Sequence, residues 1–346
     1  MTEASGAPAS LLEIDGLSVE FATDDGPLHA VDDLTLTVGE HEVLGVVGES
    51  GSGKTVTALA VLGLLPKRAT IRGSIRFRGE ELVGRSERDL QPIRGAQIAM
   101  IFQDALASLN PVMSVGHQIA EAITVHDPHA DPRDVRERVV ALLDLVGIPD
   151  PAGRARRYPH EFSGGMRQRA MIAMALANDP ALLIADEPTT ALDVTLQAQV
   201  LDVLERVRDR TGSSILLITH DLGVVAGIAE RVAVMYAGRR VEDGPVDDLF
   251  AAPRHPYTLG LLASLPRLDR PARLGSLFRI PGQPPSLVHR PPGCAFHPRC
   301  PFRALPAPCA TEVPADVVVG ETHRSACHRV AELDGVTPDE LRARPA

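Results

Sequence analysis

Short apolar segments alternate with longer amphipathic ones over residues 11 to about 250. This alternation is typical of an α/β fold with a largely parallel sheet and helices on its faces. Strands are predicted at five apolar segments, 74–77, 98–102, 181–185, 214–218 and 232–236. A helical insert is predicted over residues 104–165. In its clearest helix, Asp131 can cap the first turn, Pro132 takes the first position, and apolar residues follow at helical spacing up to Gly147.

The same pattern divides the chain into segments. We expect residues 11–103 and 166–252 to form one lobe, interrupted by the helical subdomain at 104–165. Beyond Pro253, prolines cluster and periodicity fades, which predicts a separate, loop-rich C-terminal extension over 253–332. Residues 333–346 are interpreted as a tail.

A glycine-rich loop, Gly48-Glu49-Ser50-Gly51-Ser52-Gly53-Lys54-Thr55, follows an apolar strand and precedes a helical segment. In that context the glycines let backbone N–H groups and the positive end of the helix face phosphates, which predicts a nucleoside triphosphate site. Lys54 can reach the β- and γ-phosphates, and Thr55 can offer its hydroxyl to Mg²⁺. The predicted ATP-binding positions of this loop are Gly48, Ser50, Gly51, Gly53, Lys54 and Thr55.

Two adjacent acids, Asp186 and Glu187, end the apolar segment 181–185. A strand that delivers both carboxylates at its carboxyl end suits Asp186 as a Mg²⁺ ligand. Glu187 would then orient or deprotonate an attacking water, so hydrolysis is favoured over binding alone.

Composition excludes several classes of function. With 346 residues and 44% hydrophobic content, the chain can build real cores. The net charge of −10 comes from 35 Lys plus Arg against 45 Asp plus Glu, so there is no basic excess to bind nucleic acid. No basic-then-apolar leader pattern precedes Ser10, and no apolar run approaches the ~18 residues that span a bilayer, so we expect a cytosolic chain.

A signature-like segment, Phe162-Ser163-Gly164-Gly165-Met166-Arg167-Gln168-Arg169, lies between the loop and the acid pair. Ser163 alone would be an ordinary helix cap. Residues 162–169 closely resemble the signature of ATP-binding cassette (ABC) proteins, a family of P-loop ATPases. The order of motifs is also that of the family: the phosphate loop, Gln103, the signature, Asp186-Glu187, Ala191-Leu192-Asp193 and His220.

The resemblance implies a site shared by two chains. In that family ATP lies between the phosphate loop of one subunit and the signature of the other, so Ser163, Gly164 and Gly165 would serve the partner's nucleotide. By position, Gln103 would approach Mg²⁺ and the attacking water, and His220 would hold the γ-phosphate side of the transition state. Asp193 would communicate across the dimer, with Glu187, His220 and Gln103 as the catalytic set. Phe21 would stack on adenine, although a core phenylalanine is an alternative reading.

Other segments indicate a particular subgroup of the ABC family. Residues 157–169 and 185–193, with 255–258, 261–262 and 280–285 near the C-terminus, are similar to the ATP-binding subunits of bacterial oligopeptide and dipeptide permeases. The chain departs from that pattern at Ala105-Leu106, where these proteins usually carry proline. The resemblance implies that this segment faces the membrane subunits.

The narrower resemblance implies the motor subunit of a peptide importer, on the cytoplasmic face of the membrane. Its partners would be a second ATPase, usually a distinct protein, two membrane-spanning permease subunits and, indirectly, an extracytoplasmic peptide-binding protein. Related importers of nickel, glutathione or oligosaccharides stay open. A non-transport cassette ATPase would carry a coiled-coil insertion, a second cassette or a basic surface, and none is present. Complete hydrolytic residues argue against a redox protein that uses nucleotide only for regulation.

The cysteines Cys294, Cys300, Cys309 and Cys327 are separated by five, eight and seventeen residues. A reducing compartment favours metal over disulfides, and zinc sites usually pair cysteines two to four apart. Four thiolates can also hold an iron–sulfur cluster. Permease subunits with this cysteine pattern are associated with a four-iron cluster, so we expect [4Fe–4S], with zinc or free thiols as alternatives.

Nearby histidines could substitute as ligands, but surface histidines are the simpler reading of His297, His323 and His328. We also expect replacement of Cys300 or Cys309 to spare ATP binding, because the nucleotide motifs lie in another part of the chain.

Overall fold

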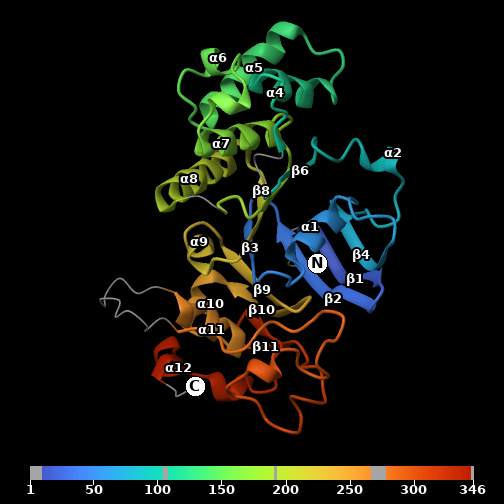
Figure 1. Cartoon of the computed structure of the whole chain (residues 1–346), viewed down its shortest axis with the longest axis vertical. Coiled ribbons are helices and arrows are strands. Elements are labelled where there is room, and N and C mark those ends of the chain that lie inside the picture. The colour runs from blue at the N-terminus through green and yellow to red at the C-terminus, as the bar shows by residue number, and fades with distance from the viewer. Residues whose placement is uncertain (1–9, 104–107, 191–192, 266–277, 344–346) are drawn as a thin grey trace, which may run out of the picture.

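The computed structural model describes residues 10–103, 108–190, 193–265 and 278–343 (Figure 1). Its strands form a four-stranded sheet of order β2-β1-β4-β5 and an eight-stranded sheet of order β11-β12-β10-β9-β3-β8-β7-β6. The strands are β1 (Ser10–Thr23), β2 (Gly26–Gly39), β3 (Val43–Val47), β4 (Ala69–Phe77), β5 (Glu80–Glu81), β6 (Ile98–Ile101), β7 (Leu182–Asp186), β8 (Ser214–Thr219), β9 (Arg231–Tyr236), β10 (Arg239–Pro245), β11 (Val317–Val318) and β12 (Arg324–Ser325).

The expected parallel sheet is present at the centre of the larger sheet. Strands β9, β3, β8, β7 and β6 pair in parallel, and every residue of β3, β7 and β8 is buried, as expected when both faces are covered. Four of the five predicted strands lie here. The fifth, 74–77, belongs to β4 in a separate antiparallel sheet that the sequence pattern did not reveal. The fold therefore has mixed sheets, because β1 and β2 pair as a long antiparallel hairpin; much of each strand buries alternate residues.

Helices cover the predicted insert. Those in the insert are α4 (Val115–Thr124), α5 (Pro132–Leu145), α6 (Pro151–Arg154) and the 3₁₀ turn η1 (Pro159–Glu161), and α7 (Gly164–Ala175) begins at its end. Elsewhere the described residues form α1 (Lys54–Val61), α2 (Glu87–Leu90), α8 (Val194–Thr211), α9 (Leu222–Ala226), α10 (Val246–Ala251), α11 (Pro256–Ser264) and α12 (Pro338–Ala343), with 3₁₀ turns η2 (His297–Arg299) and η3 (Val330–Leu333). The predicted cap is present, since Asp131 accepts a hydrogen bond from Arg133 N at 2.7 Å. Helices α4, α5 and α6 lie at one end of the molecule, opposite the C-terminal segment (Figure 1).

The C-terminal segment packs into the main core. Phe296, Phe302 and Leu333 belong to the same hydrophobic cluster as residues of β7 and β8. Residues 333–346, expected to be a tail, include α12, in which Leu341 is buried and Arg342 Nε donates to Ala263 O at 2.7 Å. This segment therefore shares the core of the nucleotide lobe, although its own sequence has little periodicity.

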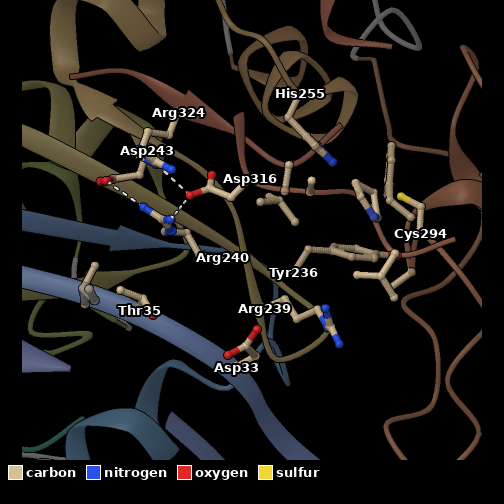
Figure 2. A pocket seen from close by; sticks show the side chains of 18 of the residues that line it. Asp33, Thr35, Tyr236, Arg239, Arg240, Asp243, His255, Cys294, Asp316 and Arg324 are labelled. Atoms are coloured by element: carbon tan, nitrogen blue, oxygen red, sulfur yellow. Dashed lines mark hydrogen bonds and ion pairs between the residues drawn. The ribbon is translucent and has the colours of Figure 1, made fainter. Parts of the chain in front are cut away.

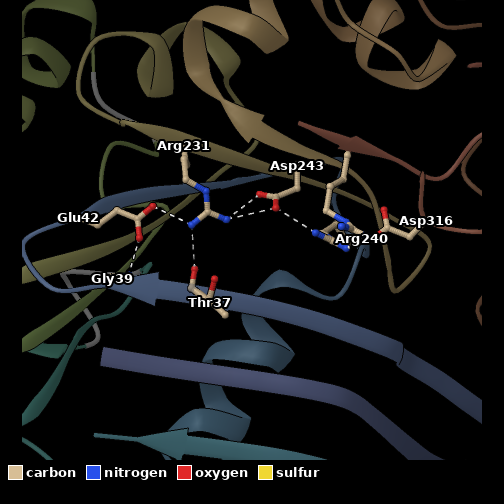
Figure 3. A network of polar contacts seen from close by, with 8 residues as sticks. Thr37, Gly39, Glu42, Arg231, Arg240, Asp243 and Asp316 are labelled. Atoms are coloured by element: carbon tan, nitrogen blue, oxygen red, sulfur yellow. Dashed lines mark hydrogen bonds and ion pairs between the residues drawn. The ribbon is translucent and has the colours of Figure 1, made fainter. Parts of the chain in front are cut away.

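A partly exposed polar network ties the segment to both sheets (Figure 3). Arg231 donates to Thr37 O at 3.4 Å and to Glu42 at 2.9 Å, and it pairs with Asp243 at 3.2 Å. Arg240 continues the chain of ion pairs from Asp243, at 3.0 Å, to Asp316 of the C-terminal segment, at 2.6 Å. Beside this network lies a cavity of about 820 Å³, lined by β2, β9, β10 and the C-terminal loops (Figure 2).

Candidate functional site

The glycine-rich loop joins the buried strand β3 to helix α1, as the sequence predicts. A Cβ atom at Gly48 would lie 2.2 Å from Met235 O, so only glycine fits there. Gly53 caps α1 with φ of 101°, and a Cβ there would lie 2.5 Å from Ala30 O. The loop is thus pressed against β9 and β2, while Ser50, Gly51 and Thr55 are exposed at its outer side. Exposed N–H groups before a helix N-terminus form an anion site.

Lys54 is buried within this loop. Its Nζ donates to Gly48 O at 2.6 Å, to Glu49 O at 3.1 Å and to Ser52 Oγ at 3.4 Å. Burial lowers the pKa of Lys54, and the charges of Glu187, Asp186 and Glu49 oppose that shift. The ammonium group therefore faces the place where the loop would hold phosphate oxygens.

The acid pair lies beside the start of α1. Asp186 ends β7, and its carboxylate accepts a hydrogen bond from Thr55 Oγ1 at 3.2 Å. Burial raises the pKa of Asp186, and the neighbouring Glu187 adds to this, against the hydrogen bond from Thr55 and the charge of Lys54. A hydroxyl and a carboxylate, both hard oxygen donors, fit a Mg²⁺ ion. The structure thus brings Thr55 and Asp186 together although 130 residues lie between them.

Glu187 contacts two other predicted residues, Gln103 and His220. Gln103 Nε2 donates to Glu187 Oε2 at 2.9 Å, and His220 Nδ1 lies 3.4 Å from Glu187 Oε1. Thr190 Oγ1 donates to the same Oε2 at 2.7 Å, a contact that the sequence analysis missed. Burial alone would raise the pKa of Glu187, but the Thr190 hydrogen bond, His220 and Lys54 together lower it. Glu187 is therefore ionised at neutral pH.

The backbone at Glu187 takes an unusual conformation. Its φ is +47°, and its N–H donates to Ile218 O of β8 at 2.8 Å. A non-glycine residue in this region carries strain of roughly 1–3 kcal/mol, which the surrounding structure must hold. The turn directs the carboxylate toward Gln103 and His220.

The signature segment lies at the N-terminus of α7. Ser163 caps the helix, since its Oγ accepts from Met166 N at 3.3 Å, and Ser163 and Gly164 are exposed. A Cβ at Gly165 would lie 2.8 Å from Leu196 Cδ2, so the signature packs against α8. Within the described residues, no hydrogen bond or ion pair joins 163–165 to the loop at 48–55 of the same chain.

Asp193 and Phe21 flank these elements. Asp193 is exposed and caps α8, accepting from Leu196 N at 2.9 Å. The adjoining Ala191 and Leu192, like Ala105 and Leu106, lie outside the described residues. Phe21 is half-buried in β1 and packs against the core of the antiparallel sheet, so its stacking role stays a prediction.

The C-terminal segment contacts the phosphate loop directly, which the sequence analysis did not anticipate. Tyr257 Oη accepts from Glu49 N at 2.8 Å. Arg299 forms a two-pronged ion pair with the Glu49 carboxylate, with N–O distances of 2.7 and 3.0 Å. Residues 49 and 299 are far apart in sequence, so no local pattern could reveal their pairing.

The four cysteines are free thiols, with Cys300 and Cys309 buried and Cys294 and Cys327 half-buried. Burial, together with the neighbouring cysteines, raises the pKa of Cys300 to about 12 and that of Cys327 to about 12. Backbone N–H groups of Ala304 and Arg329 donate to Cys309 Sγ at 3.4 Å and to Cys327 Sγ at 3.3 Å. The N–H of Cys294 donates to Cys309 O at 2.9 Å, so these two residues lie side by side. Even so, in the part of the chain that the structure describes, no three His, Cys, Asp or Glu side chains are arranged to hold a metal ion.

The nearby histidines have other partners. His323 is buried and its Nε2 lies 2.8 Å from Glu242 Oε1, so reading it as a surface histidine is wrong. His297 Nδ1 lies 2.9 Å from Cys294 O, and His328 Nε2 lies 2.9 Å from Glu312 O.

An apolar groove of about 400 Å³ lies between β6 and the helical insert. Phe102 and Val125 line it and remain 43% and 68% exposed. A search of the described helices for a stretch long and apolar enough to span a bilayer found none.

Comparisons with known proteins agree with these motifs. The ABC transporter family profile matches residues 31–190, and that of the oligopeptide/dipeptide transporter C-terminal region matches residues 241–305. The oligopeptide transport ATP-binding protein OppD of Salmonella typhimurium is 47% identical over 342 residues, covering 99% of this chain and 95% of that protein. OppD of Mycobacterium tuberculosis is 52% identical over 341 residues, 97% of this chain. The chain spans about half the length of this mycobacterial relative, 55%.

Solved structures support the fold. A dimeric ATP-binding cassette in a post-hydrolysis state, bound to ADP and Pi, aligns with a TM-score of 0.61 at 23% identity, covering 68% of this chain and 98% of that one. The cbiO1 protein of Clostridium perfringens, part of the cbiONQ transporter complex, aligns with a TM-score of 0.61 at 26% identity, over 70% of this chain and 91% of that one.

Proposed function

Because this chain belongs to the ABC transporter family, as an ATP-binding protein of the oligopeptide/dipeptide type, we propose that it is the ATP-hydrolysing subunit of a peptide importer. The observation that carries this proposal is the meeting of the acid pair with the phosphate loop. Thr55 donates to Asp186 at 3.2 Å, and Glu187 is held by Gln103 and Thr190 at 2.9 and 2.7 Å.

Each residue has a defined part in ATP hydrolysis. Lys54 and the N–H groups of the loop bind the β- and γ-phosphates. Thr55 and Asp186 would hold Mg²⁺, which offsets the charge of the phosphates. Glu187 accepts a proton from the attacking water, Gln103 orients that water, and His220 lies on the γ-phosphate side.

A complete site needs a second ATPase subunit. Ser163 and Gly164 are exposed at the N-terminus of the twelve-residue helix α7, so their N–H groups are free to bind the γ-phosphate held by a partner's loop. Asp193 is exposed on the adjacent helix α8, where it can contact the partner. We infer a partner that is a related but distinct ATPase.

The groove lined by Phe102 and Val125 is the proposed contact with two membrane-spanning permease subunits. Its exposed apolar side chains need a cover, and it lies where β6 leads toward Gln103. Movement of the helical insert on ATP binding would thus reach the permease. In this proposal the chain acts at the cytoplasmic face of the membrane, and a peptide-binding protein acts outside.

We further propose that the four cysteines hold a [4Fe–4S] cluster, with zinc as the alternative. Support comes from the backbone N–H groups that donate to Cys309 Sγ at 3.4 Å and to Cys327 Sγ at 3.3 Å, which would stabilise thiolates. A bound cluster would supply metal–sulfur bonds that join the loops of the C-terminal segment.

Reconstitution tests the proposed function. The chain, its partner ATPase and the two permease subunits are placed in proteoliposomes, and peptide uptake is measured with ATP and Mg²⁺. We expect uptake that stops in the Lys54→Ala variant. Uptake of nickel, glutathione or oligosaccharide in place of peptide would overturn the substrate assignment and leave the ATPase assignment standing.

The shared site has its own test. Ser163→Arg places a bulky cation at the start of α7, so it should block hydrolysis at the partner's phosphate loop while nucleotide still binds at Lys54. Site-resolved nucleotide trapping measures this. Loss of binding at this chain's own loop, with the partner's loop unaffected, would contradict the two-chain arrangement.

A further inference from the structure

We infer that Arg299 is a positioning residue for the phosphate loop, and that it transmits the state of the cysteine-bearing segment to nucleotide binding. The inference rests on the proposed ATPase function. It assigns a role in nucleotide binding to a residue that lies outside the nucleotide motifs.

The contact between Arg299 and Glu49 is rigid. Both terminal guanidinium nitrogens, Nη1 and Nη2, donate to the carboxylate, at 2.7 and 3.0 Å, and the Arg299 side chain is only 6% exposed. Such two-pronged pairs fix geometry more strictly than a single contact. Other hydrogen bonds fix the Arg299 side chain, because its Nε donates to Pro281 O at 2.9 Å and its Nη1 donates to Tyr236 Oη at 3.3 Å.

A second contact holds the same loop residue through its backbone. The N–H of Glu49 donates to Tyr257 Oη at 2.8 Å, and Tyr257 is fully buried. Burial raises the pKa of Tyr257, so the hydroxyl stays protonated. Glu49 is thus held at its side chain by Arg299 and at its main chain by Tyr257.

The backbone at Gly48 and Glu49 carries the carbonyl oxygens that accept hydrogen bonds from Lys54. Gly48 O and Glu49 O accept from Lys54 Nζ at 2.6 and 3.1 Å. A shift of Glu49 would therefore move the two carbonyls that orient the phosphate-binding ammonium group. Arg299 acts on nucleotide through Glu49 and Lys54, without contacting the phosphates itself.

The residues that hold the phosphate loop include two from the segment between Cys294 and Cys300. Phe296 and Arg299 both lie between Cys294 and Cys300. The Phe296 ring packs against Tyr236 at 5.1 Å and against Tyr257 at 5.4 Å, measured between ring centroids. Whatever fixes Cys294 and Cys300 fixes the position of Arg299. Replacement of Cys300 should therefore weaken ATP binding, contrary to the expectation from sequence.

Nucleotide titration of the full-length chain tests the inference. The probe is a fluorescent ADP analogue with Mg²⁺, and the variants are Arg299→Gln, Glu49→Gln and the double variant. We expect the Kd of each single variant to rise about tenfold. The double variant should bind the nucleotide no more weakly than either single variant, because each substitution removes the same Arg299–Glu49 contact. In the assembled ATPase, KM for ATP should rise while kcat changes by less than about threefold.

Matched controls separate positioning from general loss of structure. Arg303→Gln removes a nearby exposed arginine that donates to Pro298 O at 2.8 Å, and its Kd should equal that of the wild type. Arg299→Lys keeps the charge and should recover part of the affinity. If Arg299→Gln lowers the melting temperature, Glu49→Gln, at the more exposed partner, still tests the same contact.

The outcomes are distinct. A wild-type Kd in both Arg299→Gln and Glu49→Gln, or additive losses in the double variant, would overturn the inference. If the wild-type assembly fails to hydrolyse ATP but Arg299→Gln still weakens ADP binding about tenfold, the inference stands and the proposed function falls. If the wild-type assembly hydrolyses ATP normally and both Arg299→Gln and Glu49→Gln bind ADP as the wild type does, the inference falls and the proposed function stands.

Discussion

Replacing Glu187 with glutamine should slow ATP hydrolysis by orders of magnitude while leaving ATP binding intact. The amide has nearly the same size as the carboxylate. Its oxygen can still accept from Gln103 and Thr190, which donate to Glu187 at 2.9 and 2.7 Å in the wild type. The variant should therefore fold and bind nucleotide. It loses the ion pair with His220 at 3.4 Å and the ability to accept a proton.

The expected loss in the rate of hydrolysis follows from the role of Glu187 as a general base. A positioned general base contributes roughly 10²–10⁴-fold in rate, which is about 3–5 kcal/mol of activation free energy. The pKa of Glu187 is lowered, so the carboxylate is fully ionised at neutral pH and its whole contribution is lost on neutralisation. Removal of one negative charge beside the phosphates should leave ATP affinity unchanged or raise it.

The assay uses the assembled transporter with the partner's own site disabled, so that only this chain's site is measured. Phosphate release gives kcat, and equilibrium binding of labelled ATP gives Kd. Glu137→Gln, the same change at an exposed position of α5, serves as control. Turnover of Glu187→Gln within a few-fold of wild type would refute the assignment of Glu187 as the base.

Three further predictions concern other parts of the molecule. Gly48→Ala should weaken nucleotide binding and destabilise the fold by about 1–3 kcal/mol, seen by titration and melting, because its Cβ would lie 2.2 Å from Met235 O. Burial lowers the pKa of His255 from 6.5 to about 3, so stability should fall as pH drops below about 6.5. His255→Asn should remove that dependence, about 1.4 kcal/mol per pH unit in denaturant titrations, while a side-chain oxygen still caps α11. Anaerobically purified protein should contain iron and acid-labile sulfide and lose both in Cys309→Ser; stoichiometric zinc without iron would reject the cluster.

Sequence was sufficient wherever a function depends on neighbours along the chain. The phosphate loop needs a strand, a run of glycines and a helix N-terminus in that order, and all three are local properties of residues 43–61. Asp186 and Glu187 are at the end of β7 for the same reason, since a buried strand delivers its final residues to one edge of the sheet. The helical insert and the cap at Asp131 were readable from apolar spacing.

Tertiary structure alone decided which distant residues meet. The antiparallel sheet was not evident because alternation of apolar residues does not tell which strand pairs with which. Tyr257 belongs to a segment that resembles the peptide-permease subunits, and Arg299 precedes Cys300. No pattern in the neighbouring sequence predicts that either residue contacts Glu49. His323 belongs to a loop-rich segment, but folding buries it against Glu242. Ion pairs and burial depend on the path of the whole chain, so the link between the cysteine-bearing segment and the phosphate loop exists only in the folded protein.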